Sequence, residues 1–325
     1  MIFFTSCEET TVTSEVFLMD SFMVQTIHGA DGKKIAKQAE EVVKNLEETY
    51  SAYKENSLIS EINENAGIKP VKVPDEVFNL IKECVVFSEK SNGLFDLTIA
   101  PLTKLWAITS DNPKVPTLDE IDYAKSLINY NNVILDEENK TVFLKEKGMK
   151  LDFGATVKGY AAQKVLEIYK TGKINGGVLS LGGNVAVYGS KNDGTAFKIG
   201  VRDPKKSSTD YFAILETDKQ VISTSGAYER YFEQNGVTYH HILNPKTGYP
   251  CESDLLSVTV VSENGLLSDY LSTLFYMLGK DVVKEHLNEE DYSLIVIDKK
   301  DNIYISDNLK DSFTLLNDTD YKKGF

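Results

Sequence analysis

The strongest constraint on the fold is the order in which helical and strand patterns follow each other along the chain. Strand-like apolar segments dominate after residue 172, among them VLSLGGNVAVYG, FKIGVRD, VISTS and LLSVTVV, whereas helical spacing is commoner before it. The two patterns do not alternate regularly, as they would in a doubly wound parallel sheet. We therefore expect an α+β fold with a mainly antiparallel sheet flanked by helices.

The first half of the chain predicts one strand and three helices. Loose alternation from Phe17 to Ile27 predicts a first strand. Apolar residues at helical spacing predict an amphipathic helix over roughly 33–50 and a second one after Pro74-Asp75. A short third helix is expected over 118–128, after a proline.

The rest of the chain predicts two helices and two hairpins. Residues 133–144 (VILDEENKTVFL) place a polar turn between two apolar runs, which is typical of a hairpin. Helices are expected over 157–170, ending at Gly172, and over about 265–278. The C-terminal segments YSLIVID and NIYIS predict another hairpin.

Composition excludes several classes of protein. The formal charge of −14 comes from 35 Lys plus Arg against 49 Asp plus Glu, and nucleic-acid binding needs a basic surface instead. Hydrophobic residues make up 42%, enough to bury a core, and no apolar run approaches the ~20 residues of a membrane helix. Three cysteines do not make a disulfide scaffold or a zinc module, and Cys84 faces the predicted core. The 325 residues fit one large domain or two ordinary ones.

The N-terminus has the pattern that ends a lipoprotein signal. Met1 to Phe4 is apolar, two small residues follow, and Cys7 stands where a bacterial lipoprotein carries its lipidated cysteine. The apolar run is too short for a complete signal, so we expect the upstream part to be missing. A frayed end without a role is the alternative. Residues 8–16 should form a polar tether.

Two glycine-rich segments admit a functional and a structural interpretation. The chain has no GxxxxGK[ST] phosphate loop and no GxGxxG after a strand. Gly176-Gly177 and Gly182-Gly183 indicate either bulges or a backbone that a ligand approaches closely. In LDFGATVKGYA (151–161) a helix start could bind an anion, or Asp152 or Thr156 could simply cap the helix. The STSG segment (223–226) could bind phosphate or form a turn.

Two histidines and one acidic helix residue are candidates for chemistry. His240 and His241 are adjacent, so on a strand at most one of them can point into a given pocket. Asp269 and Thr273 are four apart and share one face of an otherwise apolar helix. A carboxylate, a hydroxyl and a carbonyl oxygen would suit Mg²⁺ or Ca²⁺ but not zinc. The alternative is that Asp269 caps its own helix and Thr273 bonds back to it.

Together and in this order, the motifs resemble those of the ApbE family, the FAD:protein FMN transferases. The segments that carry the resemblance are Met19–Phe22, SAYKENSLISEIN, GLFDLTIAPLTKLW, LDFGATVKGYA, GGVLSLGGNVAVYG, STSGAYERYF, HHILNPKTGYP and SDYLSTLFYMLG. Several blocks in one order over about residues 17–280 are specific where a single block is not. The resemblance favours one large domain over 17–325, preceded by a signal remnant and tether over 1–16.

The resemblance implies a Mg²⁺-dependent enzyme that uses FAD as substrate. FMN would be transferred to a Thr hydroxyl of an acceptor protein, with release of AMP. Acceptors in the family are typically membrane-associated electron-transfer subunits outside the cytoplasm. The expected location is therefore extracytoplasmic, at the outer face of the cell membrane or in the periplasm, with a lipid anchor on Cys7.

The resemblance also implies a set of site residues. The metal ligands would be Asp269, Thr273 and the main-chain carbonyl of Ala155. His241 would be the general base that accepts the Thr proton. Flavin contacts would come from Met19, Tyr53, Leu94, Phe95, Asp96, Asp152, Lys158 and Leu243, with the Tyr53 ring covering the isoalloxazine.

Some positions depart from the family pattern, and two other functions remain open. Asp20-Ser21 replaces Gly-Thr, Asn244 stands where Asp is common, Lys158 stands where some members have Glu, and 107–109 replaces a Gly-containing stretch. The alternatives are a Mg²⁺-dependent FAD pyrophosphatase, with water as nucleophile, and a non-catalytic flavin-binding lipoprotein. Asp269 with Thr273 opposes the second alternative, because storage needs no metal site. The pyrophosphatase differs from the transferase only in a nucleophile that this chain does not contain.

Overall fold

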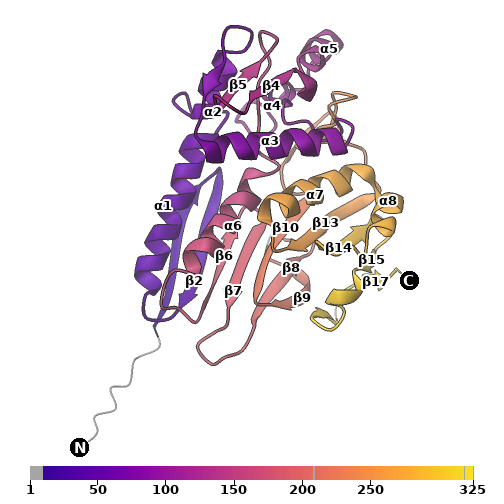
Figure 1. Ribbon diagram of the computed structural model, residues 1–325. Coiled ribbons are helices and arrows are strands. Elements are labelled where there is room, and N and C mark those ends of the chain that lie inside the picture. The colour runs from indigo at the N-terminus through magenta and orange to yellow at the C-terminus, as the bar shows by residue number, and fades with distance from the viewer. Residues whose placement is uncertain (1–9, 208, 318, 325) are drawn as a thin grey trace, which may run out of the picture.

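A nine-stranded sheet forms the centre of the molecule (Figure 1). The computed structural model describes residues 10–207, 209–317 and 319–324. In spatial order the strands are β1 (Thr11–Leu18), β2 (Ser21–His28), β6 (Gly176–Leu181), β7 (Asn184–Gly189), β10 (Lys219–Gly226), β13 (Leu255–Ser262), β14 (Ser293–Asp298), β15 (Asn302–Ile305) and β17 (Lys322–Lys323). Neighbouring strands are antiparallel except β15 and β17, which confirms the predicted α+β class with a mainly antiparallel sheet.

Helices cover one face of this sheet and cap its upper end. They are α1 (Gly32–Tyr50), α2 (Leu58–Glu64), α3 (Asp75–Lys90), α4 (Ala100–Trp106), α5 (Leu118–Ser126), α6 (Val157–Tyr169), α7 (Gly265–Leu278) and α8 (Lys280–Glu285), with short 3₁₀ turns at Tyr130–Asn132 and Asp307–Leu309. Figure 1 shows α1, α6 and α7 along the sheet and α3 across its upper end. Their apolar faces and the sheet bury one large core, which includes Cys84 as predicted.

Three smaller sheets complete the fold. They are β3 (Val71–Lys72) with β4 (Val133–Asp136) and β5 (Thr141–Leu144), β8 (Phe197–Arg202) with β9 (Tyr211–Thr217) and β16 (Phe313–Leu315), and β11 (Tyr231–Gln234) with β12 (Val237–His240). The β8–β9–β16 sheet packs on the opposite face of the main sheet around a second core. The structure thus has cores on both faces of its central sheet, which is why β13 and β14 are buried at nearly every position.

The N-terminal prediction is wrong in part. Residues 11–16, expected in a polar tether, form most of β1 instead. The expected single strand from Phe17 to Ile27 is the second arm of a hairpin, because the chain turns at Met19 and Asp20, both with positive φ (52° and 56°). Neither residue is glycine, so the turn has no strong signal in the sequence. Cys7 lies outside the described residues.

The other predicted elements are confirmed, with boundaries within a few residues. The helices expected over 33–50, 118–128, 157–170 and 265–278 are α1, α5, α6 and α7, and the one expected after Pro74-Asp75 is α3. The hairpin over 133–144 is β4 with β5, and the C-terminal one is β14 with β15. The short helices α2, α4 and α8 were not predicted, because six or seven residues are too few for a clear period.

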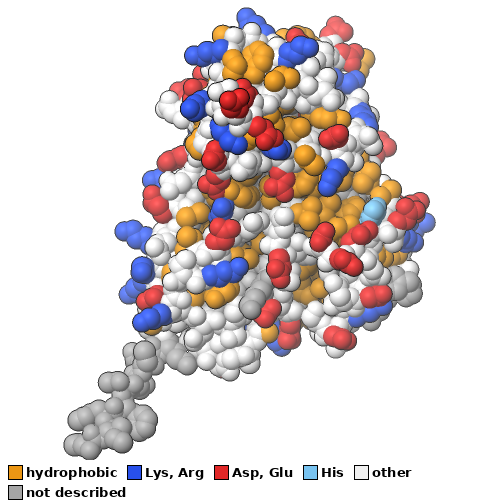
Figure 2. Space-filling model, viewed as in Figure 1, with side chains coloured by type: hydrophobic (Ala, Val, Ile, Leu, Met, Phe, Trp, Pro, Cys, Tyr) orange, Lys and Arg blue, Asp and Glu red, His pale blue; other side chains and the backbone are white. Residues whose placement is uncertain are grey.

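On the face in Figure 2, Lys and Arg side chains are interspersed with Asp and Glu instead of gathering in one basic patch. No helix of the described residues is long and apolar enough to cross a membrane.

Candidate active site

A cavity of about 1050 Å³ lies at the end of the main sheet where the β1–β2 and β6–β7 turns meet the segments around α2, α4 and α6. Every residue proposed from the sequence for metal, flavin or proton transfer lines it: Met19, Tyr53, Leu94, Phe95, Asp96, Asp152, Ala155, Lys158, His241, Leu243, Asp269 and Thr273. The first and the last of these residues, Met19 and Thr273, are more than 250 positions apart in the sequence, and the fold brings the whole set to one cavity.

Asp269 is a buried carboxylate that connects α7 to the first turn of α6. It is 6% exposed, and its Oδ2 accepts the Gly159 N–H at 2.9 Å while Oδ1 accepts from the Asn184 side-chain amide at 3.3 Å. Burial raises the pKa of this carboxyl, and the nearby Lys158 ammonium opposes that rise. The alternative that Asp269 caps its own helix is wrong, because Asn264 is the N-cap of α7.

No side chain from the residues just before α6 caps the start of this helix. Thr156 Oγ1 donates to the Phe153 carbonyl, and Asp152 Oδ1 accepts from the Gly154 amide, so neither serves a helix amide. Gly159 is the third residue of α6, so its amide has no carbonyl partner within that helix. Asp269 of α7 accepts this amide and so caps α6 from a neighbouring helix.

The oxygen atoms around this point fit a hard cation. Asp269 supplies a carboxylate, Thr273 a hydroxyl and Ala155 a carbonyl, and all three residues line the cavity. Thr273 Oγ1 lies 3.2 Å from Ser225 Oγ, so it contacts β10 and does not simply bond back to its own helix. Within the described part of the chain there is no cluster of three His, Cys, Asp or Glu, which leaves this mixed oxygen set as the metal candidate.

Lys158 places a positive charge in the lining of the cavity. Its Nζ donates to the Gly154 carbonyl oxygen at 3.2 Å, and its charge acts on both Asp269 and His241. An ammonium between a carboxylate and a histidine is suited to phosphate oxygens. The chain thus compensates locally for its overall charge of −14.

The two adjacent histidines have different environments, as predicted. His241 lines the cavity, while the His240 ring is buried beside Cys251. The Ile242 amide donates to His240 Nδ1, so its proton lies on Nε2, which faces the Cys251 carbonyl at 3.0 Å. His241 has the opposite tautomer, because its Nδ1 lies 3.2 Å from the Arg230 carbonyl, which can only accept. Its Nε2 therefore keeps a free lone pair.

Burial and the Lys158 charge lower the pKa of His241 from 6.5 to about 3. Burial lowers the pKa of His240 as well. Both rings are therefore neutral near pH 7, and only His241 can accept a proton from a group in the cavity.

Tyr53 stands at the rim of the cavity with its hydroxyl tied inward. The side chain is 63% exposed, and its hydroxyl donates to Asp152 Oδ2 at 3.4 Å. Asp152 Oδ2 also accepts from Thr103 at 2.9 Å, and Lys104 Nζ lies 5.4 Å from the centre of the Tyr53 ring. An exposed aromatic face above a cavity is suited to stacking on a planar ring.

The remaining predicted flavin contacts form the walls. Leu94, Phe95 and Leu243 contribute apolar surface. Asp96 uses both oxygens inside the protein, accepting from the Thr98 amide and hydroxyl and from the Tyr130 amide. Its carboxylate therefore shapes the loop that carries Phe95.

The structure also shows the environment of Gly182-Gly183, of the STSG segment and of Asn244, whose roles the sequence left open. Gly182 and Gly183 form the β6–β7 turn with positive φ, and a Cβ on Gly182 would come within 3.1 Å of Ser21 and Lys158. Thr224 and Ser225 line the cavity, so the STSG segment is part of the site. Asn244 Oδ1 accepts the amides of Lys246 and Thr247, which a carboxylate at that position would do as well.

Several lining residues were not predicted, notably Asp20, Asn184 and Arg230. Arg230 stands opposite His241 at the open end of the β11–β12 hairpin, whose turn is Asn235-Gly236 with φ of 54° and 76°. The Asn-Gly dipeptide is the strongest short hairpin signal, and it would have placed the two residues together. Asn184 follows the Gly182-Gly183 turn, and no local pattern marks its contact with α7.

Comparison with known proteins identifies relatives that match this chain over most of its length. A protein-family model described as the ApbE family matches residues 9–297. The chain is 35% identical over 290 residues to the FAD:protein FMN transferase of Klebsiella pneumoniae (strain 342), covering 89% of this chain and 90% of the relative. It is 32% identical over 242 residues to the FAD:protein FMN transferase of Treponema pallidum (strain Nichols), covering 70% and 67%.

A solved structure shares the fold. The crystal structure of the ApbE protein from Thermotoga maritima matches with a TM-score of 0.84 at 31% identity, covering 93% of this chain and 99% of that one. Because the match covers nearly the whole length of both chains, the two proteins share one architecture.

Proposed function

This chain belongs to the ApbE family, and from that premise we propose that it is an FAD:protein FMN transferase. The two relatives named above carry this activity in their names. The cavity supports the proposal because it brings together the groups that phosphoryl transfer needs.

The observation that carries the proposal is the meeting of three kinds of group in one cavity. Asp269, Thr273 and the Ala155 carbonyl offer oxygen donors, Lys158 offers a cation, and His241 offers a neutral imidazole. We assign Mg²⁺ to the oxygen donors, where it would offset negative charge on the pyrophosphate and on the AMP leaving group. Lys158 binds phosphate oxygens beside it.

The chemical step exchanges one phosphoester partner for another. The acceptor's Thr oxygen forms a bond to the phosphorus on the FMN side of FAD, and the bond from that phosphorus to the bridging oxygen breaks, so AMP leaves. The Thr proton passes to His241 Nε2. The lone pair of this nitrogen is free because the ring's own proton is on Nδ1, where it is donated to the Arg230 carbonyl. Tyr53 covers the flavin ring, and Met19, Leu94, Phe95 and Leu243 line its binding site.

One incubation separates the three functions. Purified protein, FAD, Mg²⁺ and an acceptor fragment with a Thr-containing flavinylation motif should yield an acceptor heavier by one FMN, together with AMP. The matched control is the same fragment with that Thr replaced by Val, which should stay unmodified. Free FMN with AMP and no adduct would establish the pyrophosphatase, and FAD recovered intact would leave only flavin binding.

We further propose that the protein acts outside the cytoplasm on a membrane-associated acceptor, anchored by a lipid on Cys7. The support is the local pattern around Cys7 and the short distance in sequence to β1, which begins at Thr11. Fractionation of the producing cells tests the anchor. The protein should sediment with membranes and its Cys7→Ser variant should not; a wild-type protein that stays soluble contradicts the proposal.

A further inference from the structure

An ion pair joins two residues of the cavity lining that are 210 positions apart in the sequence. Arg230 Nη1 donates to the Asp20 carboxylate, and Nη2 donates to the Asp20 backbone carbonyl at 2.6 Å. Both residues line the cavity. A guanidinium held by two acceptors of one residue has little freedom to turn, so the pair fixes Arg230 against the β1–β2 turn.

The turn that holds Arg230 is itself attached on its other side. The Met19 amide donates to Glu47 Oε1 at 3.0 Å, which ties the turn to α1. Asp20 has a φ of 56°, a left-handed backbone that glycine would adopt more easily. The turn therefore does not need the Asp20 side chain for its conformation, and the function of that side chain is its contact with Arg230.

Arg230 in turn holds His241 through its backbone. Its carbonyl accepts the His241 amide at 3.0 Å and faces His241 Nδ1 at 3.2 Å. The two residues are opposite each other just outside the β11–β12 ladder, beyond the Tyr231–His240 pair. Beyond this pair Glu229 is bonded to Arg202, and the Ile242 carbonyl accepts the Cys251 amide. The Arg230 side chain adds the contact that ties this end of the hairpin to the β1–β2 turn.

We propose that Asp20 and Arg230 are positioning residues for His241: the ion pair fixes the Arg230 carbonyl, and this carbonyl holds the proton of His241 on Nδ1 so that Nε2 faces the acceptor hydroxyl. The proposal rests on the proposed function, in which His241 is the base. It assigns a task to Asp20, where this chain departs from the glycine of the family pattern.

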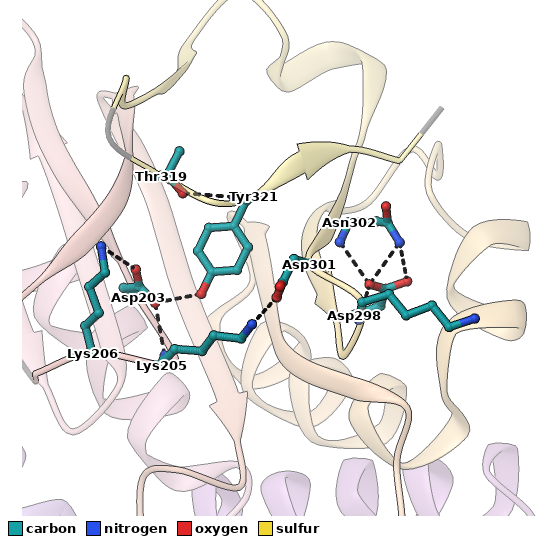
Figure 3. A network of polar contacts seen from close by, with 9 residues as sticks. Asp203, Lys205, Lys206, Asp298, Asp301, Asn302, Thr319 and Tyr321 are labelled. Atoms are coloured by element: carbon teal, nitrogen blue, oxygen red, sulfur yellow. Dashed lines mark hydrogen bonds and ion pairs between the residues drawn. The ribbon is translucent and has the colours of Figure 1, made fainter.

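The test variant is Asp20→Gly, which suits the positive φ of the turn and removes only the side chain. Its matched control is Asp301→Gly. Asp301 also has positive φ (67°) and also pairs with a cation, Lys205 (Figure 3), but it does not line the cavity. Asp20→Asn is the conservative variant, because its side-chain oxygen can still accept from Arg230.

The first measurement is steady-state transfer. Asp20→Gly should lower kcat by about tenfold, a part of the roughly 10²–10⁴-fold that a general base contributes. KM for FAD should stay within about twofold. Asp20→Asn should recover part of kcat, and Asp301→Gly should match the wild type. A rise in KM with unchanged kcat would make the pair an FAD contact and overturn the proposal.

The second measurement needs no activity. Spectra of ¹⁵N-histidine-labelled protein distinguish the two ring tautomers, and the chain has only 4 histidines. His241 should show the Nδ1–H form in the wild type and a mixture in Asp20→Gly, while His240 keeps its Nε2–H form. An unchanged His241 tautomer in Asp20→Gly would overturn the positioning role. A wild-type protein without transfer activity would remove the proposed function, and the spectra alone would then decide the role of the pair.

Discussion

At the scale of single residues, Asp269 has two tasks that together explain a charged group inside an apolar helix. It accepts the Gly159 amide at the start of α6, and it offers its carboxylate to the cavity beside Thr273. A buried carboxylate is costly unless it is hydrogen-bonded or paired with positive charge. Here the amide, Asn184 and the nearby Lys158 ammonium lower that cost, and a bound cation would lower it further.

Asp269→Asn should weaken the response to Mg²⁺ while leaving the protein folded. The amide keeps an oxygen for the Gly159 N–H but loses the charge that attracts a cation, so we expect the Mg²⁺ concentration for half-maximal transfer to rise by roughly 10- to 100-fold. Asp254→Asn is the control, because Asp254 lies at the other end of α7 and accepts the Lys280 amide. An unchanged Mg²⁺ response in Asp269→Asn would contradict the metal assignment.

His241 should make the protein less stable in acid. Its pKa in the folded protein is about 3, below its ordinary value of 6.5, so the unfolded chain binds more protons between these values. Stability therefore falls as pH drops from 6.5 toward 3. His241→Gln removes this contribution and should show a shallower loss of melting temperature over that range. The control is His286→Gln, at a partly exposed position beside Glu289; equal slopes for wild type and His241→Gln would refute the lowered pKa of His241.

At the scale of elements, the proposed metal site depends on how closely α6 and α7 cross. Gly159 and Gly265 face each other at the crossing, and a Cβ on Gly159 would lie 2.1 Å from the Gly265 carbonyl oxygen and 2.5 Å from the Asp269 Cβ. Only glycine allows this approach. The same approach brings the Gly159 amide within hydrogen-bonding distance of Asp269.

Gly159→Ala should therefore disturb both packing and the site. The added methyl group must push α7 away, which we expect to cost about 1–3 kcal/mol in the free energy of unfolding. Urea denaturation measures this cost, and the Mg²⁺ response should weaken in the same variant. Gly200→Ala is the control, since Gly200 has no left-handed backbone and its Cβ would meet only the exposed Tyr211 side chain. A Gly159→Ala protein as stable as this control would show that the crossing can relax.

At the scale of the whole molecule, the C-terminal segment closes the second core. β17 pairs with β15, and Tyr321 packs beside Phe212 on the β8–β9 sheet. Figure 3 shows the Tyr321 hydroxyl donating to Asp203, a buried carboxylate in the loop after β8, at 2.6 Å. The last residues thus tie the small sheet to the edge of the main sheet, far from the cavity.

Tyr321→Phe should reduce stability without affecting transfer. Asp203 would lose a buried donor, which we expect to cost about 1–3 kcal/mol in the free energy of unfolding. Tyr123→Phe, at an exposed position on α5, is the control. Urea denaturation and the transfer assay are run on both variants. A loss of transfer in folded Tyr321→Phe would mean that the C-terminal segment acts on the cavity.

Much of the fold was predictable because its signals are local. The spacing of apolar residues in α1, α3, α6 and α7 and the alternation in the later strands depend only on neighbouring residues. The β1–β2 hairpin was missed because Met19 and Asp20 adopt positive φ without a glycine to mark the turn. That conformation is held by contacts to Glu47 and Arg230, which are distant in sequence.

By itself, the sequence determined the chemical types of the candidate site. A carboxylate and a hydroxyl four residues apart on an apolar helix limited the metal to a hard cation, and two adjacent histidines beside a turn limited the base to one of the pair. The family resemblance already indicated His241, but only the tertiary structure showed the tautomer of its ring, the residue that holds this ring and the amide that Asp269 accepts. The physical reason is that a residue type and its period are local properties. Tautomer, burial and charge compensation, in contrast, depend on groups that meet only when the sheet and its helices have packed.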